Sequence, residues 1–166
     1  PGEAEIGHLR LDRSGSTVES LCAGWAVDRR IRELKREQPH GLLARLVGQD
    51  TSGEARHLRA AFDRGDEAAG KILRETAADL AFGLSHVIHL FHPDVIVLGG
   101  GLSLLGEPLR EAVCAALPPF LMAAFQPGPA VRLARLGEDA VPIGALLLGG
   151  ATVASSSGQL PAEQDK

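Results

Sequence analysis

Three polar residues near the start of the chain could together bind a small molecule rich in hydroxyl groups. Glu5 and His8 lie on either side of Gly7, and Glu19 follows in the stretch EIGHLRLDRSGSTVESLCAGW, residues 5–25. Carboxylates accept hydrogen bonds from hydroxyls, and an imidazole can donate or accept them, so these residue types suit a small polyol. The structural alternative is that Glu5 and His8 lie on an exposed strand face.

Glu19 has a second interpretation of its own. The sequence STVE at 16–19 matches a capping box, with Ser16 as the N-cap and Glu19 three residues later. In that motif the glutamate reaches back to the N-cap amide, which by itself accounts for the residue type. A helix start also favours a negatively charged group. The capping box therefore leaves a ligand role for Glu19 open.

A run of glycines forms a second candidate site. The segment VLGGG at 97–101 reads as the end of a buried strand followed by Gly99, Gly100 and Gly101. Glycines let the backbone approach a ligand closely, and ligands of α/β sheets bind at the carboxyl ends of strands. The alternative is a tight turn between a strand and a helix. The run is neither a GxGxxG motif nor a Walker loop.

Three histidines invite a metal-site interpretation. His86, His89 and His92 repeat every third residue near the end of a predicted helix. Successive members lie about 60° apart around the axis, so only neighbours could share a metal. No cysteine or carboxylate with ligand spacing accompanies them. We predict no metal here, and histidines near a helix C-terminus also complement its dipole.

The bulk properties exclude several classes of function. The chain has 166 residues, a formal net charge of -4 and a hydrophobic fraction of 45%, as expected for one globular domain. The sequence has no lysine- or arginine-rich run of the kind that indicates nucleic-acid binding. No apolar run reaches the roughly 20 residues of a membrane helix. Cys22 and Cys114 lie in apolar patterns, which favours free thiols in the cytoplasm. Because the chain opens Pro-Gly-Glu and its only methionine is Met122, we expect it to be part of a longer protein.

The hydrophobic pattern predicts a mixed α/β chain in which helices dominate around a small sheet. The clearest element is a helix over 66–92, whose apolar residues recur alternately four and three apart until Pro93. The helix predicted to begin at Ser16 has Leu21, Trp25, Val27, Ile31 and Leu34 as candidate core residues. The full prediction is an extended segment at 5–11, a loop at 12–16, helices at 16–37, within 42–53, at 54–64, at 66–92, from 107 and at 139–154, and strands at 94–101 and 130–136. Residues 1–154 are taken as the domain and 155–166 as a disordered tail.

Four segments occur in an order that resembles the ROK family. They are GEAEIGH, ESLCAGWAV, PDVIVLGGGLS and LGEDAVPIGALLLG, and the resemblance covers residues 2 to about 153. The family groups bacterial repressors, uncharacterised reading frames and sugar kinases on the actin-like ATPase (ribonuclease H-like) fold. The chain is similar to the carboxyl-terminal part of such proteins.

The resemblance implies roles for the candidate residues. Glu5 and His8 match the family's ExGH motif, which binds sugar hydroxyls, and Glu19 matches a glutamate that also contacts the sugar. Residues 99–101 match a glycine run that lies beside the adenosine of the nucleotide. The implied reaction is phosphorylation of a hexose or N-acetylhexosamine by ATP with Mg²⁺. Family members are commonly dimers or tetramers, so a homo-oligomer is expected.

The sequence departs from the family in two ways. First, members commonly carry CxCGxxGCxE before the glutamate, where a histidine and three cysteines bind zinc. Here that span is LRLDRSGSTV, residues 9–18, without a cysteine. Structural zinc needs four ligands, which His8 alone cannot supply. We predict no zinc, and a tighter loop stabilised by the capping box.

Second, nothing here matches the family's phosphate loop or the aspartate that takes the sugar hydroxyl's proton. Asp94 and Asp139 read as turn and cap residues, so no catalytic residue is assigned and we expect the chain alone not to phosphorylate hexoses. The leading hypothesis is the carboxyl-terminal half of a ROK-type sugar kinase. The alternatives are the sugar-sensing half of a ROK-type repressor and an inactive dimerisation module.

Overall fold

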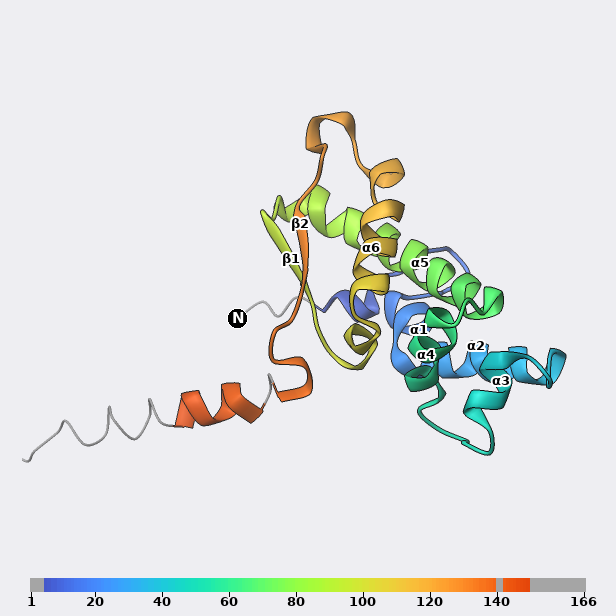
Figure 1. Cartoon of the computed structure of the whole chain (residues 1–166). Coiled ribbons are helices and arrows are strands. Elements are labelled where there is room, and N and C mark those ends of the chain that lie inside the picture. The colour runs from blue at the N-terminus through green and yellow to red at the C-terminus, as the bar shows by residue number, and fades with distance from the viewer. Residues whose placement is uncertain (1–4, 140–141, 150–166) are drawn as a thin grey trace, which may run out of the picture.

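The computed structural model describes residues 5–139 and 142–149. The chain is mostly helical, with one small sheet (Figure 1). Its helices and strands are α1 (Val18–Cys22), α2 (Gly24–Glu37), α3 (Leu42–Val47), α4 (Leu58–Asp63), α5 (Glu67–Phe91), β1 (Val95–Leu98), α6 (Glu107–Ala116) and β2 (Ala130–Leu133). The mixed α/β order predicted from the sequence is therefore present over these residues.

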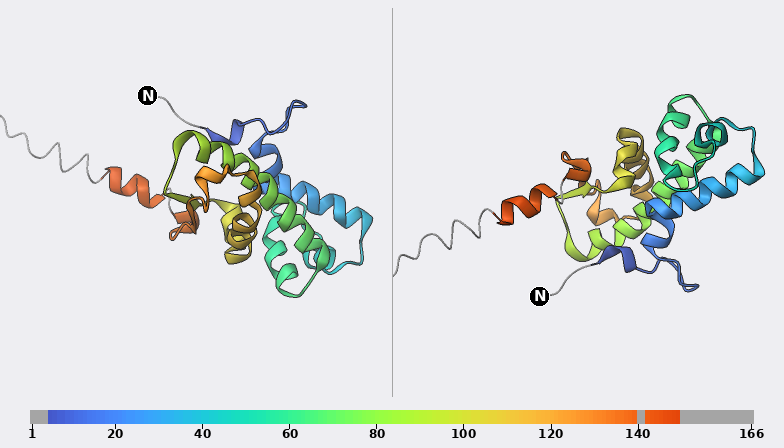
Figure 2. Two further views of the ribbon diagram at one scale, coloured as in Figure 1. Left: turned by 90° about the horizontal axis from the view of Figure 1, so that it is seen from above. Right: turned by 90° about the horizontal axis from the view of Figure 1, so that it is seen from below.

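Helix α5 is the element against which α1, α4 and α6 all pack (Figures 1 and 2). The Asp66 carboxylate begins it by accepting a hydrogen bond of 2.8 Å from the amide of Ala69. The helix ends where His92 adopts a left-handed conformation, directly before Pro93, because the residue before a proline is disfavoured in the helical region. The helix predicted at 66–92 is thus confirmed to within one residue at each end.

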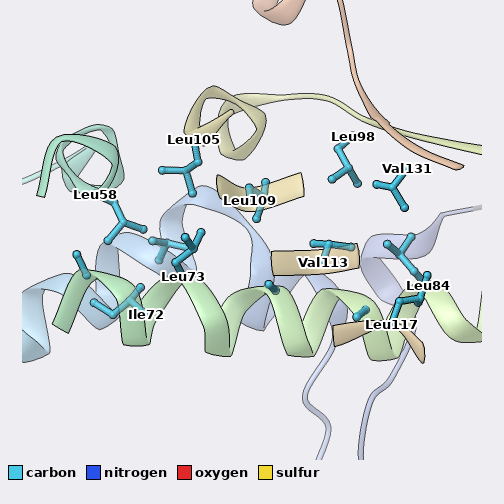
Figure 3. Close-up of a cluster of buried hydrophobic side chains, with 14 of the residues drawn as sticks. Leu58, Ile72, Leu73, Leu84, Leu98, Leu105, Leu109, Val113, Leu117 and Val131 are labelled. Atoms are coloured by element: carbon cyan, nitrogen blue, oxygen red, sulfur yellow. The ribbon is translucent and has the colours of Figure 1, made fainter. Parts of the chain in front are cut away.

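The hydrophobic core lies between α5, α6 and one face of the sheet. Figure 3 shows Val113 of α6 and Leu117, the residue after α6, beside Leu84 of α5, with Leu98 and Val131 of the strands above them. All five side chains are buried. Helix α6 connects the two strands, as expected for a parallel pair, which needs a crossover connection.

The sheet has two parallel strands, and its register pairs Val95 with Ala130 and Leu98 with Leu133. The strand predicted at 94–101 was expected to be fully buried, and this is wrong. Ile96 and Leu98 are buried, but Val95 and Val97 are 46% and 61% exposed. The alternation arises because helices cover only one face of this sheet in the described part of the chain.

The first predicted elements are also corrected. Residues 6–8 form a 3-10 turn, Ile6–His8, instead of an extended segment, and the only extended pairing nearby is a bridge between Arg10 and Thr17. The helix predicted at 16–37 is two helices. Ala23 has an extended conformation, with φ of -66° and ψ of 156°, and it separates α1 from α2.

Two buried carboxylates, Asp28 and Glu54, connect the first half and middle of α2 to the segment after α3. Asp28 accepts hydrogen bonds from the amides of Gly53 and Ala55 at 3.2 and 2.7 Å. Glu54 is fully buried and forms an ion pair of 2.6 Å with Arg32. Burial, the largest single effect, would raise the pKa of Glu54, but the hydrogen bond from Arg32, a backbone hydrogen bond and the charges of Arg32 and Lys35 together lower it. Buried carboxylates are tolerated because each is hydrogen-bonded.

Several predictions concern the end of the chain. Residues 142–149 are helical and extend away from the rest of the described chain (Figures 1 and 2), in agreement with part of the helix predicted at 139–154. Residues 140–141, the end of that helix and the tail predicted at 155–166 lie outside the described residues. None of the helices in the described part of the chain is both long enough and apolar enough to cross a membrane.

A glycine allows α1 to lie close to α5. A methyl group added at Gly83 would come within 2.6 Å of Cγ2 of Val18, so we expect Gly83→Ala to push α1 away. The net loss of stability should be about 1–2 kcal/mol, because overpacking costs about 1–3 kcal/mol and alanine gains about 1 kcal/mol of helix propensity. The denaturation midpoint in urea measures this loss.

Gly70 is the matched control in the same helix. A methyl group there would meet the flexible end of Arg74 at 3.1 Å, and that side chain can move. Gly70→Ala should therefore raise the midpoint slightly through helix propensity. Equal stability of the two alanine variants would contradict a tight contact between α1 and α5.

Candidate functional site

The first polar group of the candidate site, the Glu5 carboxylate, is held in place by a nearby backbone amide. The Glu5 carboxylate accepts a hydrogen bond of 3.0 Å from the amide of Gly7, which makes Glu5 the cap of the Ile6–His8 turn. This turn packs against α1. The arrangement holds the Glu5 carboxylate beside the start of α1.

The capping box of α1 lies one residue later than predicted. Thr17 is the N-cap, its hydroxyl accepts from the amide of Ser20 at 3.2 Å, and the Ser20 hydroxyl accepts from the amide of Thr17 at 2.8 Å. Ser16 is not the cap, because its carbonyl accepts from the amide of Leu11 and its amide donates to Asp12 in the preceding loop. Glu19 consequently has no part in the capping box, and the structural explanation for its residue type is wrong.

Glu5 and Glu19 line the same cavity, of about 390 Å³. They also lie close together: a methyl group at Gly7 would be 3.0 Å from Oε1 of Glu5 and 3.5 Å from Cβ of Glu19. Ile96 and Val97 of β1 form another wall. We call this space the carboxylate cavity. It combines apolar walls with two acceptors, as binding sites for small polar molecules commonly do.

His8 does not line the carboxylate cavity. Its side chain lies in a neighbouring apolar groove together with His86, Leu90 and Phe91, and Glu5 borders both spaces. Of the three residues that the sequence grouped together, the structure thus brings two into one cavity and leaves the third at an adjoining one.

The glycine run lies at the same cavity. Gly99 and Gly101 line it. Gly100 has φ of 78° and ψ of -176°, a conformation open essentially to glycine alone. The buried Ser103 hydroxyl donates to the carbonyl of Gly100 at 2.7 Å, which fixes the turn that follows. The end of β1 therefore presents bare backbone next to the two carboxylates.

A second cavity, of about 470 Å³, adjoins the first, and Gly24, Gly101 and Leu102 line both. We call it the tryptophan cavity, because Trp25 forms part of its wall. The Trp25 side chain is 47% exposed, and the Arg29 guanidinium lies 5.4 Å from the centre of its ring.

Trp25 was predicted as a core residue, and this is wrong. The helical repeat itself gives the signal that was missed: at 100° per residue, Trp25 lies about 200° around α2 from the buried Val27. Val27 and Ile31 are fully buried, as predicted.

Neither a larger cavity nor the thiol of Cys22 is assigned a role in the candidate site. A larger cavity of about 590 Å³ lies between α2 and α5, but charged side chains of both signs, including Arg30, Glu33 and Lys71, line it, and it contains none of the predicted site residues. Cys22 borders the carboxylate cavity, yet burial and then the negative charge of Asp79 raise the pKa of its thiol to about 12. It is therefore a poor nucleophile.

The three histidines of α5 and its end have separate partners. His86 Nδ1 lies 2.9 Å from the carbonyl of Phe82, and His89 Nε2 accepts from the amide of Met122 at 3.2 Å. The ring of His92 packs edge-on against Phe125. Among the residues that the structure describes, no three side chains able to bind a metal are grouped together.

Comparisons with known proteins agree on one family. A model of the ROK family matches residues 2–151. A glucokinase of Thermotoga maritima is 30% identical over 154 residues, 86% of this chain and 47% of that protein. An N-acetyl-D-glucosamine kinase of Haemophilus influenzae is 35% identical over 106 residues, 62% of this chain and 34% of that protein.

Comparison with solved structures points to the same family. A ROK family glucokinase from Streptomyces griseus, crystallised with glucose and AMPPNP, superimposes with a TM-score of 0.69 at 26% identity, over 82% of this chain and 47% of that one. This similarity agrees with the actin-like ATPase fold expected from the motifs. The chain spans about half the length, or less, of the proteins it matches.

The site makes a prediction about thiol chemistry. A thiol of pKa about 12 carries roughly a thousandfold less thiolate at pH 8 than an ordinary one of about 8.5. Because the thiolate is the reactive form, a thiol-specific disulfide reagent should label Cys114 and spare Cys22 until denaturant unfolds the chain. Rates for Cys22→Ser and Cys114→Ser assign the two thiols. Labelling of folded Cys114→Ser at the rate of a free thiol would contradict this burial of Cys22.

Proposed function

Because this chain belongs to the ROK family, we propose that it forms the sugar- and nucleotide-binding half of an ATP-dependent hexose kinase. The observation that carries the proposal is the pair of adjoining cavities, which share Gly24, Gly101 and Leu102 as a common wall. Phosphoryl transfer depends mainly on positioning two substrates and stabilising charge. Two cavities with one common wall suit that requirement.

The carboxylate cavity is the proposed sugar site. Glu5 and Glu19 would accept hydrogen bonds from sugar hydroxyls, and the apolar side chains of β1 would contact the carbon-bound hydrogens of the ring. The kinases matched above act on glucose and N-acetyl-D-glucosamine by their names, which favours a hexose or N-acetylhexosamine as the ligand.

His8 is included in the proposed sugar site at its edge. It belongs to the same 3-10 turn as the amide that holds Glu5, but its side chain lies in the adjoining groove. We therefore expect His8 to contribute less to sugar affinity than either carboxylate.

The tryptophan cavity, with the glycine run at 99–101, is the proposed nucleotide site. The exposed ring of Trp25 offers a flat surface on which an adenine can stack. Arg56 and Arg59 line the same cavity. The AMPPNP bound to the Streptomyces griseus glucokinase supports a nucleotide ligand. Mg²⁺ would accompany ATP and neutralise charge on its phosphates.

The proposal assigns no residue of this chain to accept the proton of the sugar hydroxyl. We propose that this group and the phosphate loop belong to another part of the whole protein, whose relatives are about twice as long. A sugar-responsive regulator ranks second, because the two named relatives are kinases. The cytoplasmic location and the homo-oligomer stay predictions.

The sugar site is tested by removing charge from one carboxylate at a time. Glu5→Gln and Glu19→Gln should each weaken binding of glucose or N-acetyl-D-glucosamine by about tenfold to a hundredfold, since a hydrogen bond to a charged group contributes about 1.5–3 kcal/mol. Isothermal titration calorimetry measures the affinities, with the melting temperature as a check on folding.

Glu33→Gln is the matched control, because Glu33 is an exposed carboxylate in the separate cavity between α2 and α5. It should bind sugars as the parent does. No heat of binding with glucose, mannose or N-acetyl-D-glucosamine in the parent protein would exclude the proposed sugar site. Unchanged affinity in both Glu5→Gln and Glu19→Gln would exclude these residues as its ligands.

The nucleotide site has a built-in reporter, because Trp25 is the single tryptophan of the chain. Titration with Mg²⁺ and AMPPNP should change its fluorescence. By isothermal titration calorimetry, Trp25→Leu should lower AMPPNP affinity about tenfold, within the roughly 1–3 kcal/mol that stacking contributes. Phe91→Leu removes an exposed aromatic ring elsewhere and should leave this affinity unchanged. If Trp25→Leu binds AMPPNP as well as Phe91→Leu does, the base stacks elsewhere.

A further inference from the structure

The loop between the two carboxylates is a closed hairpin. The amide of Leu11 donates to the carbonyl of Ser16 at 2.8 Å, and the amide of Val18 donates to the carbonyl of Leu9 at 3.0 Å. Arg10 and Thr17 form an antiparallel bridge between these two bonds. Residues 9–18 therefore connect the turn that holds Glu5 directly to the first residue of α1.

One oxygen atom organises the tip of this hairpin. Oδ1 of Asp12 accepts hydrogen bonds from the Ser14 hydroxyl at 2.7 Å and from the amides of Gly15 and Ser16 at 2.8 and 3.0 Å. Gly15 has φ of 104° there, a conformation that favours glycine. The hydrogen bonds from Ser16 and Ser14 keep the pKa of Asp12 well below its usual range, so the carboxylate stays charged.

The hairpin decides where α1 begins. Within it, the Ser16 carbonyl accepts from Leu11 and the Ser16 amide donates to Asp12, so the first helical carbonyl and the cap are those of Thr17, and Glu19 is placed in the first turn outside the capping box. On the other side, the hairpin leads back to Gly7, where an added methyl group would contact the Glu5 carboxylate and Cβ of Glu19. The separation of Glu5 and Glu19 therefore depends on the closure of residues 9–18.

A zinc ion, which the family resemblance implies for this segment, does not fit the residues present. His8 lies in the groove beside His86. The Cys22 thiol is buried and directed at the carbonyl of Thr76, 3.8 Å away. Within residues 5–139 and 142–149, no three ligating side chains are grouped, whereas structural zinc requires four.

We propose that Asp12 is the positioning residue of the sugar site: by closing the hairpin at residues 9–18 through a single oxygen, it sets Glu5 and Glu19 at a distance at which both contact one sugar, without a metal ion. This inference rests on the proposed function for the identity of the ligand. It assigns Asp12 no contact with the ligand itself.

Two variants of Asp12 separate the loss of its hydrogen bonds from the loss of its charge. Asp12→Asn keeps Oδ1 and can accept all three hydrogen bonds, whereas Asp12→Ala removes them all. Sugar affinity should fall about tenfold or more in Asp12→Ala and stay within about twofold of the parent in Asp12→Asn, as expected when a single acceptor is lost or conserved. Ser14→Ala, which removes one of the three bonds, should fall between them.

Two further readouts separate positioning from general loss of structure. Binding of AMPPNP, followed by Trp25 fluorescence, should be the same in all of these variants. Amide hydrogen exchange at Leu11 and Val18 should accelerate most in Asp12→Ala, less in Ser14→Ala and not in Asp12→Asn. Neither EDTA on the parent nor added Zn²⁺ on Asp12→Ala should change sugar affinity.

The results that would contradict the role of Asp12 can be distinguished from those that would contradict the proposed function. Sugar binding by Asp12→Ala equal to that of the parent, or unchanged exchange at Val18, overturns the role of Asp12. A loss of sugar affinity on adding EDTA to the parent overturns the metal-free hairpin. Absence of sugar binding in the parent overturns the proposed function instead, and the exchange measurement then still decides whether Asp12 closes the hairpin.

Discussion

The contact between Val18 and Gly83 is the constraint on which the arrangement of the site depends. Helix α1 has five residues, far fewer than an isolated helix needs to be stable in water. It persists because it packs on α5, where the absence of a side chain at Gly83 lets Val18 approach the helix backbone. Glu19 follows Val18 directly, so the position of one carboxylate is determined by the packing of its neighbour.

The break at Ala23 divides the chemistry between two spaces. Glu19 lies in α1 and lines the carboxylate cavity, while Trp25 lies in α2 and lines the tryptophan cavity. Gly24, between the two helices, borders both. A single extended residue therefore allows one short stretch of sequence to line two different cavities.

The sequence predicted the elements whose cause is local and failed where tertiary contacts decide. Helix α5 could be predicted because its apolar period and Pro93 act within the helix itself. The start of α1 could not, since Ser16 and Thr17 are both competent caps and the choice is made by the hydrogen bonds of Ser16 to Leu11 and Asp12 in the hairpin. The exposure of Val97 was missed because a run of apolar residues does not reveal how many faces of a sheet are covered.

The open face of β1 has a consequence for how the protein is made and handled. Val95 and Val97 are exposed, and β1 has one neighbour in the two-stranded sheet of the described chain. An unpaired strand edge is a template on which other chains can add. During synthesis or refolding, the open edge of β1 is therefore available for pairing with a second chain, a bimolecular event that becomes more frequent as the protein concentration rises.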